Sequence, residues 1–441
     1  MKKIILFFSL LLLSLSSSFS QTTRKETIVA PALSDFPVAF SLLTHGNKQF
    51  VAFYDPEHRM TVAARDVDEN KWTFQVLPSK IGWDGHNSIA MKIDSEDQIH
   101  LSGNMHVNPL VYFRTSVPLD ITSFKEINYM TGKDESRVTY PAFMTGPDGS
   151  FIYHYRDGGS GEGNEVFNVY DSRSHTWHRL LDKPLTDGEN KMNAYMSGPT
   201  LGPDGFYHLV WVWRDTYHCE TNHHLSYARS RNLTDWESVD GKHVDLPLTI
   251  AKKELWIDPT PPKGGLINGG NQIGFDNMNR LLITYHKFDK NGNNQAYIAR
   301  FSQNKWEIKQ LSNWNYRWYF SGGGGIPFEI NIKGAQKNGD NTVLVRYEHI
   351  KNGEGYWLVN ENTLEVIKTV TVKPPVNEEH HVAKPALSLS KRKANDFGKG
   401  YKGKRFFLEW ESLPQNRDTI RTGVQAPPTL LKVVEETGST L

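Results

Sequence analysis

Two histidines, each beside an asparagine, stand at the outer ends of a predicted hairpin. His86 precedes an alternating apolar run at 89–93, and His106 follows a second run at 99–101. A polar turn at 94–97 joins the two runs, which is the pattern of a β-hairpin. The outer ends of a hairpin meet, so both imidazoles are expected at one end of one hairpin. This arrangement indicates a functional site rather than a core.

Three more side chains complete a candidate catalytic set. Tyr140, Arg156 and Tyr195 lie close to strand ends and add two phenols and a guanidinium to the two imidazoles. The set suits proton abstraction beside a carboxylate, with the arginine or a donating histidine neutralising that carboxylate. A tyrosine or histidine takes the C5 proton of a uronate, and another protonates the leaving oxygen at C4. This chemistry needs no nucleophile and no cofactor. Singly, each residue is more often structural, and the sequence leaves open which one is the base.

Other polar residues near the set have less specific patterns. We expect Asn87, Asn104 and Arg214 to bind the substrate.

Glycoside hydrolysis would need a carboxylate pair. The available acids lie mostly in turns, where aspartate has a local hydrogen-bonding role. No pair stands out among Asp84, Asp94, Asp97, Asp157, Glu162 and Asp215.

A cysteine and nearby histidines form a possible metal site. Cys219 lies four residues before His223, and a thiolate with imidazoles is a zinc-binding combination. The spacing matches no standard zinc finger, and a catalytic zinc would need an open coordination position. We therefore predict a structural zinc held by Cys219 and His223. A buried free cysteine among surface histidines is an equally good interpretation. As the single cysteine of the chain, Cys219 leaves no partner for an internal disulfide.

A repeated unit positions these residues. An Asp, Asn or Gly turn followed by an apolar, aromatic-rich strand recurs seven times, about every 50 to 75 residues. This period is typical of a propeller, in which each unit is a four-stranded blade. The predicted strands are 49–54, 99–101, 151–155, 206–213, 281–286, 343–347 and 405–410. Outer strands are marked by Trp72, Trp177, Trp236 and Trp306.

The repeats predict an all-β protein with one seven-bladed β-propeller. No linker rich in Pro, Gly or Ser divides residues 21–441, so we expect a single catalytic domain there. A strand near 27–30 should complete the last blade, because ring closure hides sheet edges. Loops from different blades meet near the axis, so residues far apart in sequence can share a pocket. Two β-sandwiches are the alternative fold.

The N-terminus and the composition bear on location and partners. Lys2 and Lys3, an apolar run at 4–15 and a serine-rich segment predict a signal peptide over residues 1–20. The run is too short to span a bilayer, so we expect an exported, periplasmic or secreted protein without a membrane span. The net charge of +1 disfavours nucleic acid as a partner. Abundant Trp, Tyr and Gly fit a β-rich carbohydrate-active protein, which we expect to be monomeric.

Several motifs resemble one known family. WDGHN, IHLSGNMH, VTYPAF, YRDGGSGEGN, VWVWRDT and CETNHHLSYARS are similar to segments of the BNR-repeat propellers, in particular the seven-bladed ulvan lyases. The resemblance implies β-elimination on an anionic rhamnose–uronate poly- or oligosaccharide, which leaves a 4,5-unsaturated uronate. The leaving group is a sugar in a lyase or water in an oligosaccharide dehydratase. The family's catalytic cluster falls on His86, His106, Tyr140, Arg156 and Tyr195, and its zinc site falls near Cys219 and His223.

Two other functions stay open at this point. The family also resembles α-L-rhamnosidases that remove rhamnose from glucuronate through a histidine on the opposite face, and His45 is the matching residue. A non-catalytic glycan-binding propeller is the third hypothesis. Sialidases are disfavoured, because their Asp-box pattern is not met cleanly and an arginine triad is not evident.

Overall fold

The computed structural model describes residues 23–373, 388–422 and 426–437 and consists almost entirely of β-strands. Its helical content, within those ranges, is three short 3-10 turns. This confirms the all-β prediction, whereas the predicted signal peptide lies outside the described residues. No described helix is long and apolar enough to cross a membrane. The 3-10 turns are η1 (Ile121–Ser123), η2 (Cys219–Thr221) and η3 (Lys253–Leu255).

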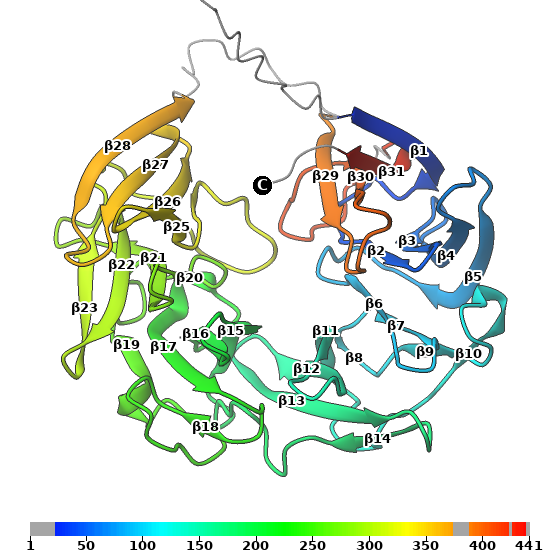
Figure 1. Ribbon diagram of the computed structural model, residues 1–441, viewed down its shortest axis with the longest axis horizontal. Helices are drawn as coiled ribbons and strands as arrows, with labels where there is room; N and C mark the ends of the chain where they lie inside the picture. The colour runs from blue at the N-terminus through cyan, green and yellow to red at the C-terminus, as the bar shows by residue number, and fades with distance from the viewer. Residues whose placement is uncertain (1–22, 374–387, 423–425, 438–441) are drawn as a thin grey trace, which may run out of the picture.

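The described strands form seven antiparallel sheets that follow one another around a ring in chain order (Figure 1). The first sheet holds β2 (Ser41–His45), β3 (Lys48–Tyr54), β4 (Arg59–Asp66) and β5 (Thr73–Lys80). The second holds β6 (Ile89–Ile93), β7 (Ile99–Gly103), β9 (Tyr112–Thr115) and β10 (Phe124–Glu126). The third holds β8 (His106–Asn108), β11 (Val138–Thr145), β12 (Phe151–Gly159), β13 (Glu162–Asp171) and β14 (Thr176–Arg179).

The remaining four sheets continue the ring. The fourth holds β15 (Asn193–Leu201), β16 (Tyr207–Arg214), β17 (Asn222–Ser230), β18 (Trp236–Glu237) and β19 (Trp256–Asp258). The fifth holds β20 (Gln272–Phe275), β21 (Leu281–Phe288), β22 (Asn294–Ser302) and β23 (Lys305–Gln310). The sixth holds β24 (Ile330–Ile332), β25 (Gln336–Gly339), β26 (Thr342–His349), β27 (Gly353–Asn360) and β28 (Val366–Lys373). The seventh holds β29 (Ser390–Asn395), β30 (Arg405–Ser412), β31 (Thr429–Thr437) and β1 (Thr23–Ala32).

The sequence repeat coincides with the sheets. Six of the seven predicted repeat strands lie next to the strand that begins the sheet, as β3, β7, β16, β21, β26 and β30. The seventh, β12, lies one place further in, because β8 joins the third sheet beyond β11. The tryptophan-marked segments also agree, since β14, β18 and β23 lie at sheet edges and Trp72 directly precedes the edge strand β5. Seven sheets in one ring are not the arrangement of two β-sandwiches.

The chain closes its last sheet with its first strand. β1 pairs antiparallel with β31, from Thr23 opposite Thr437 to Ala32 opposite Thr429. This confirms the predicted role of the strand near 27–30. The pairing gives the backbone groups of β31 partners on both sides, because β30 lies on its other edge. An edge that would otherwise be open to other chains is thereby covered.

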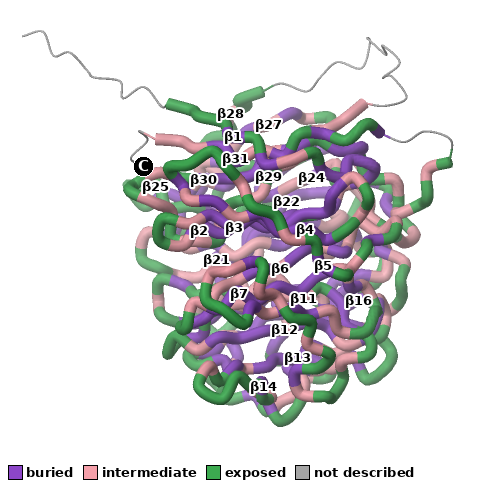
Figure 2. The backbone as a smooth tube through the Cα atoms, turned by 90° about the vertical axis from the view of Figure 1, so that its right-hand side faces the viewer, coloured by how far each residue is buried: buried purple, intermediate pink, exposed green. Residues whose placement is uncertain are grey.

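The core lies between adjacent sheets and along their middle strands, as the buried parts of the tube show (Figure 2). Phe40 and Trp410 stack with ring centroids 4.7 Å apart and join the first sheet to the seventh. All residues of β16 are buried, including Trp211 and Trp213. Truncating such a tryptophan to alanine costs about 3–5 kcal/mol of stability. The packing therefore fixes the strand ends that carry polar side chains.

Candidate active site

The hairpin at the start of the site forms as predicted. β6 and β7 pair antiparallel, and Ile89 lies opposite Gly103 at the open end. A Cβ at Gly103 would lie 2.9 Å from the Ser88 carbonyl oxygen, so only glycine allows this close approach. The segment before β6 and the strand β8 after β7 then lie together. Both predicted histidines are therefore at one end of the second sheet and the neighbouring third sheet.

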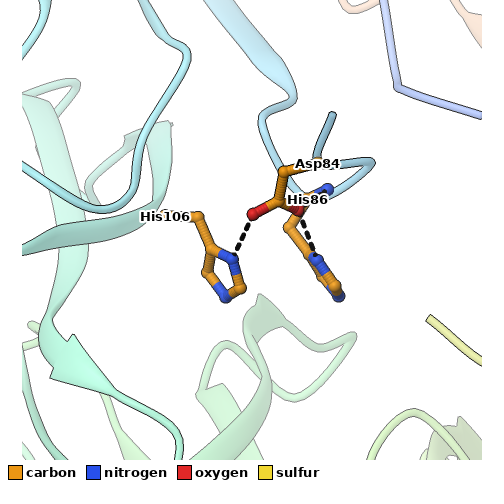
Figure 3. A group of neighbouring side chains, drawn as sticks. All are labelled: Asp84, His86 and His106. Atoms are coloured by element: carbon orange, nitrogen blue, oxygen red, sulfur yellow. Dashed lines mark hydrogen bonds and ion pairs between the residues drawn. The ribbon is translucent and has the colours of Figure 1, made fainter. Parts of the chain in front are cut away.

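One carboxylate holds both imidazoles (Figure 3). Asp84 Oδ1 accepts a hydrogen bond from His86 Nδ1 at 2.7 Å, and Oδ2 accepts one from His106 Nδ1 at 2.6 Å. A hydrogen bond that fixes Nδ1 as the donor determines how the ring is oriented. The second nitrogen of each ring, Nε2, points away from Asp84 (Figure 3). The two rings stack with centroids 4.5 Å apart.

Tyr140 extends the imidazole pair. Its ring centroid lies 5.7 Å from that of His106 and 5.9 Å from that of His86. The residue has a φ of 54°, in the left-handed region that side chains other than glycine rarely adopt. β11 shows a register irregularity at the same place, between Thr139 and Ala142. Strain at a residue held by its surroundings is typical of functional positions.

Arg156 lies beneath the phenols and is only 1% exposed. Its guanidinium carbon is 4.9 Å from the ring centroid of Tyr140 and 5.1 Å from that of Tyr195. Nε donates to the Gly158 carbonyl at 3.1 Å, whereas the buried Nη2 has no hydrogen-bond partner. A Cβ at Gly163 would lie 2.8 Å from Arg156 Cδ, so this glycine makes room for the side chain. An unsatisfied buried guanidinium nitrogen is costly, and it places positive charge under both phenols.

Tyr195 lies between two guanidinium groups. Its hydroxyl is 2.5 Å from Ser160 Oγ and accepts a hydrogen bond from Arg214 Nη1 at 3.3 Å. The Arg214 guanidinium carbon is 5.2 Å from the Tyr195 ring centroid. Arg214 is 7% exposed and also donates to the Thr216 carbonyl at 3.0 Å. Tyr195 is therefore the phenol of the set that lies closest to positive charge on two sides.

The surroundings shift the pKa values of the two phenols, Tyr195 and Tyr140, in opposite directions. Burial raises the pKa of Tyr195, but the charges of Arg156 and Arg214 outweigh it and bring the pKa below its ordinary value. Burial and the neighbouring Tyr195 raise the pKa of Tyr140. Titratable pairs with opposite shifts are the usual basis for assigning acid and base roles. Tyr195 is the easier phenol to ionise, and Tyr140 keeps its proton.

The pKa values of Asp84 and His86 are shifted by their mutual hydrogen bond. Burial would raise the pKa of Asp84, but the hydrogen bonds from His106 and His86 hold that pKa well below its usual range. Burial lowers the pKa of His86, yet the hydrogen bond to Asp84 and the charge of Asp418 outweigh it, so the pKa is raised. His86 is therefore biased toward the imidazolium form.

These groups share one cavity of about 370 Å³. Glycine-rich and C-terminal segments form its other wall, at 323–326 and 415–418. Arg156 lies behind the lining rather than in it. The lining residues are Asp84, His86, His106, Tyr140, Ser160, Tyr195, Arg214, Tyr217, Cys219, Ile267, Asn268, Gly323, Gly324, Gly325, Ile326, Phe328, Gln415, Arg417 and Asp418.

The structure brings together the five predicted catalytic residues and Arg214, but it places both asparagines elsewhere. Asn87 is 7% exposed, and its carbonyl accepts a hydrogen bond from the Tyr54 hydroxyl at 2.8 Å. Asn104 Nδ2 donates to Ser79 Oγ and to the Lys80 carbonyl, both at 3.0 Å. Neither asparagine lines the cavity. Their positions fit structural roles at the hairpin ends better than the predicted contact with substrate.

The predicted zinc ligands do not form a metal-binding group. His223 Nε2 is 2.8 Å from Asp215 Oδ1, and its Nδ1 is 2.7 Å from His224 Nδ1. Cys219 lines the same cavity as His86 and Tyr195, and burial raises its thiol pKa. Within the described ranges, one group of three His, Cys, Asp or Glu has ligand atoms within 4.8 Å of one another, and it is Asp84, His86 and His106. As placed, Cys219 and His223 therefore do not form the zinc site that the resemblance implies.

Sequence reasoning missed several residues of the cavity. The sequence suggests for Asp84 only a place in a carboxylate pair for hydrolysis, although its position two residues before His86 also suits an anchoring role. Asp418 lies 332 positions after His86 in the chain, and no local pattern points to it. Ser160 follows two glycines in a loop whose path the sequence does not define. The contacts of these residues depend on how distant turns meet.

His45 lies at the other end of its sheet. It is in the turn between β2 and β3, and its Nε2 is 2.9 Å from Asp97 Oδ1 in the turn between β6 and β7. That second turn is opposite the open hairpin end that carries His86. The placement agrees with the expectation that His45 is on the opposite face from the main cluster. Both side chains are well exposed, at 41% for His45 and 48% for Asp97.

Comparison with known proteins identifies the family of this chain. The sequence profile of the BNR repeat-containing family matches residues 48–314. This chain belongs to that family. The match covers the five predicted catalytic residues and Arg214, and it confirms the family resemblance seen in the motifs.

Curated relatives of this family member are ulvan lyases. The short isoform of ulvan lyase from Alteromonas sp. (strain LOR) is 27% identical over 174 residues, which are 36% of this chain and 33% of the relative. The long isoform from Pseudoalteromonas sp. (strain PLSV) is 45% identical over 133 residues, which are 28% of this chain and 13% of the relative. The matched segments thus span about a third or less of each relative's length.

Solved structures show the same fold over nearly the whole chain. The polysaccharide lyase Uly1 superposes with a TM-score of 0.63 and 16% identity, covering 93% of this chain and 98% of Uly1. A PL25 ulvan lyase bound to -[GlcA(1-4)Rha3S]- gives a TM-score of 0.55 and 14% identity, covering 88% and 93%. At these identities the likeness establishes the fold.

Proposed function

We propose that this protein is a carbon–oxygen lyase that cleaves by β-elimination at a uronate linked to rhamnose in ulvan-type saccharides. The observation that carries the proposal is Tyr195, a phenol between two guanidinium groups that faces a carboxylate-anchored imidazole pair. The ulvan lyase relatives and the bound uronate–rhamnose ligand of one structural neighbour support this substrate class. We further propose that the seven sheets are the blades of one catalytic propeller and that the protein is exported.

The reaction assigned to the cavity needs a base, an acid and a positive charge. Tyr195, as phenolate, accepts the proton from C5 of the uronate. The electrons of the C5–H bond form the C4=C5 double bond, and the C4–O4 bond breaks. Tyr140 donates its proton to the departing oxygen, which is more basic than a phenolate. The product is a 4,5-unsaturated uronate, and proton exchange between the phenols and water restores the starting state.

The positive groups stabilise the charge that develops on the carboxylate. The His86 imidazolium faces the cavity, and the buried Arg156 contributes a fixed charge below it. Fixed charges in a site with little water stabilise such an intermediate without reorganisation. Arg156 is too enclosed to contact a bound sugar directly, so its part is to favour ionised Tyr195. This differs from direct pairing with the substrate carboxylate, the role expected from the sequence.

The same groups serve a sugar or a water leaving group. Elimination of a sugar shortens the chain and defines a polysaccharide lyase, whereas elimination of water from a terminal uronate defines a dehydratase. Mass spectrometry of products from defined ulvan oligomers separates the two cases. Shorter chains with an unsaturated end indicate lyase action, and uncut chains that have lost one water indicate dehydratase action. Release of rhamnose without an unsaturated product would overturn the proposal in favour of a hydrolase.

A further inference from the structure

The connection from β30 to β31 enters the site from outside the family-matched segment. The profile match ends at residue 314, whereas Gln415, Arg417 and Asp418 line the cavity. Asp418 contacts two separate parts of the chain. Its Oδ1 accepts a hydrogen bond from the Gly85 N–H at 3.2 Å, and Oδ2 accepts one from the Gly325 N–H at 2.9 Å.

The backbone around Asp418 is held in an unusual conformation. Arg417 and Asp418 have φ angles of 61° and 55°, so two successive non-glycine residues are left-handed. The Arg417 N–H donates to the Gly325 carbonyl at 3.2 Å, and its Nη1 donates to the Ser321 carbonyl at 2.7 Å. Such a conformation persists only where surrounding contacts determine it. The contacts here tie the connection to the segment 321–325 and aim the Asp418 carboxylate at the histidine loop.

Asp418 is the second carboxylate at one imidazole. Its Oδ2 is 3.3 Å from His86 Nδ1, the atom that also lies 2.7 Å from Asp84 Oδ1. The Asp418 side chain is 22% exposed and that of His86 is 26% exposed, so water screens the pair only in part. The other groups facing His86 are His106, Tyr140 and the positive charge of Arg156, which opposes its protonation.

We propose that Asp418 is a positioning residue that, together with Asp84, keeps His86 protonated and directed into the cavity. The effect of this role on catalysis rests on the proposed lyase function. The electrostatic role itself concerns the free protein. Asp418 thereby links the last sheet and the glycine segment 322–325 to the reacting end of the second sheet.

The test is an NMR titration of the His86 ring in the full-length protein, with its signal assigned by its loss in His86→Gln. Asp418→Asn, which removes the charge and retains an acceptor, should shift the His86 titration to lower pH. Asp418→Glu should restore it at least in part. In ulvan-oligomer assays, the alkaline limb of kcat/KM should move down with the NMR titration. A merely structural role would lower Tm without moving the titration.

An unchanged His86 titration in folded Asp418→Asn would overturn the proposal. If that variant does not fold, Asp418→Ser provides the same test with a smaller neutral acceptor. Asp171, an exposed residue at the end of β13 that does not line the cavity, supplies the matched control as Asp171→Asn. Because the titration needs no substrate, its outcome is independent of whether the proposed lyase reaction is found.

Discussion

Each of the two opposite faces of the ring carries a histidine–aspartate pair, and only one of these pairs lies in a cavity with other groups suited to catalysis. His86 with Asp84 and His45 with Asp97 have similar nitrogen–oxygen distances, 2.7 and 2.9 Å. The first pair lies in a cavity with a second imidazole, two phenols and nearby guanidinium groups. The second is exposed, and neither of its members lines that cavity. A histidine–aspartate pair alone therefore does not distinguish the proposed active site. The buried positive charge beside an ionisable phenol is the feature that sets it apart.

The largest expected change in kcat distinguishes the Tyr195 face from the His45 face. Tyr195→Phe removes the proposed base while keeping the ring, and it should lower kcat by about 10²–10⁴-fold. His45→Ala should change kcat by less than about twofold, since His45 lies outside the cavity and takes no part in the proposed reaction. Both variants are assayed on ulvan oligomers by the absorbance of the unsaturated product. Loss of activity in His45→Ala with retention in Tyr195→Phe would move the site to the opposite face and favour the rhamnosidase hypothesis.

Substitutions of the proposed acid, Tyr140, and of His86 should cause the next largest losses of kcat. Tyr140→Phe removes the proposed proton donor, and His86→Ala removes the imidazolium; each should lower kcat by about 10²–10³-fold while the protein still folds. Circular dichroism and thermal melting verify the fold. The loss for Tyr140→Phe should be smaller with a leaving group of low basicity, which needs less help from an acid. Equal losses for all leaving groups would assign Tyr140 to another role.

A shift in pH dependence tests the charge around Tyr195. Arg214 lowers the pKa of Tyr195, and the reaction needs the phenolate, so activity rises as pH increases through that pKa. Arg214→Gln removes a charge that lowers the pKa, so the rising limb of kcat/KM should move to higher pH. Arg214→Lys keeps the charge and should move the limb less. An unmoved limb in Arg214→Gln would show that Tyr195 is not the titrating base.

The smallest effect concerns stability. The folded-state pKa of Asp84 is depressed by its histidine partners, so this carboxylate stabilises the fold above its ordinary pKa and loses that contribution as pH falls. Asp84→Asn should lower the free energy of unfolding near neutral pH by about 1.5–3 kcal/mol, the range for hydrogen bonds to charged groups. The difference from the parent protein should shrink in acid. Denaturant melts at several pH values measure it, and a constant difference would contradict the linkage.

The sequence predicted the periodic parts of the molecule well. Alternating runs after polar turns located one inner strand of each of the seven sheets, because pleated strands that pack between neighbours must alternate or be wholly apolar. The β6–β7 hairpin and the pairing of β1 with β31 were also predicted. These features depend on local pattern or on closure of a repeated ring.

The parts of the site that depend on distant loops could not be predicted. His86, His106, Tyr140, Arg156 and Tyr195 were found because their residue types and motifs suggest chemistry. Asp418 and the segment 323–326 reach the cavity only because the ring brings the sixth and seventh sheets around to the second. The depth of Arg156 was also invisible in the sequence, since it depends on how the phenols cover it. Asn87 and Asn104 lie close in sequence to the cavity histidines His86 and His106, but they do not line the cavity themselves.

The most direct test of the central claim is ultraviolet absorbance during incubation of the purified protein with ulvan oligomers, followed by mass spectrometry. The proposed chemistry predicts a rising absorbance from the conjugated uronate in the parent protein and none in Tyr195→Phe. Release of free rhamnose with no absorbance change, or an equal rise in Tyr195→Phe, would contradict it.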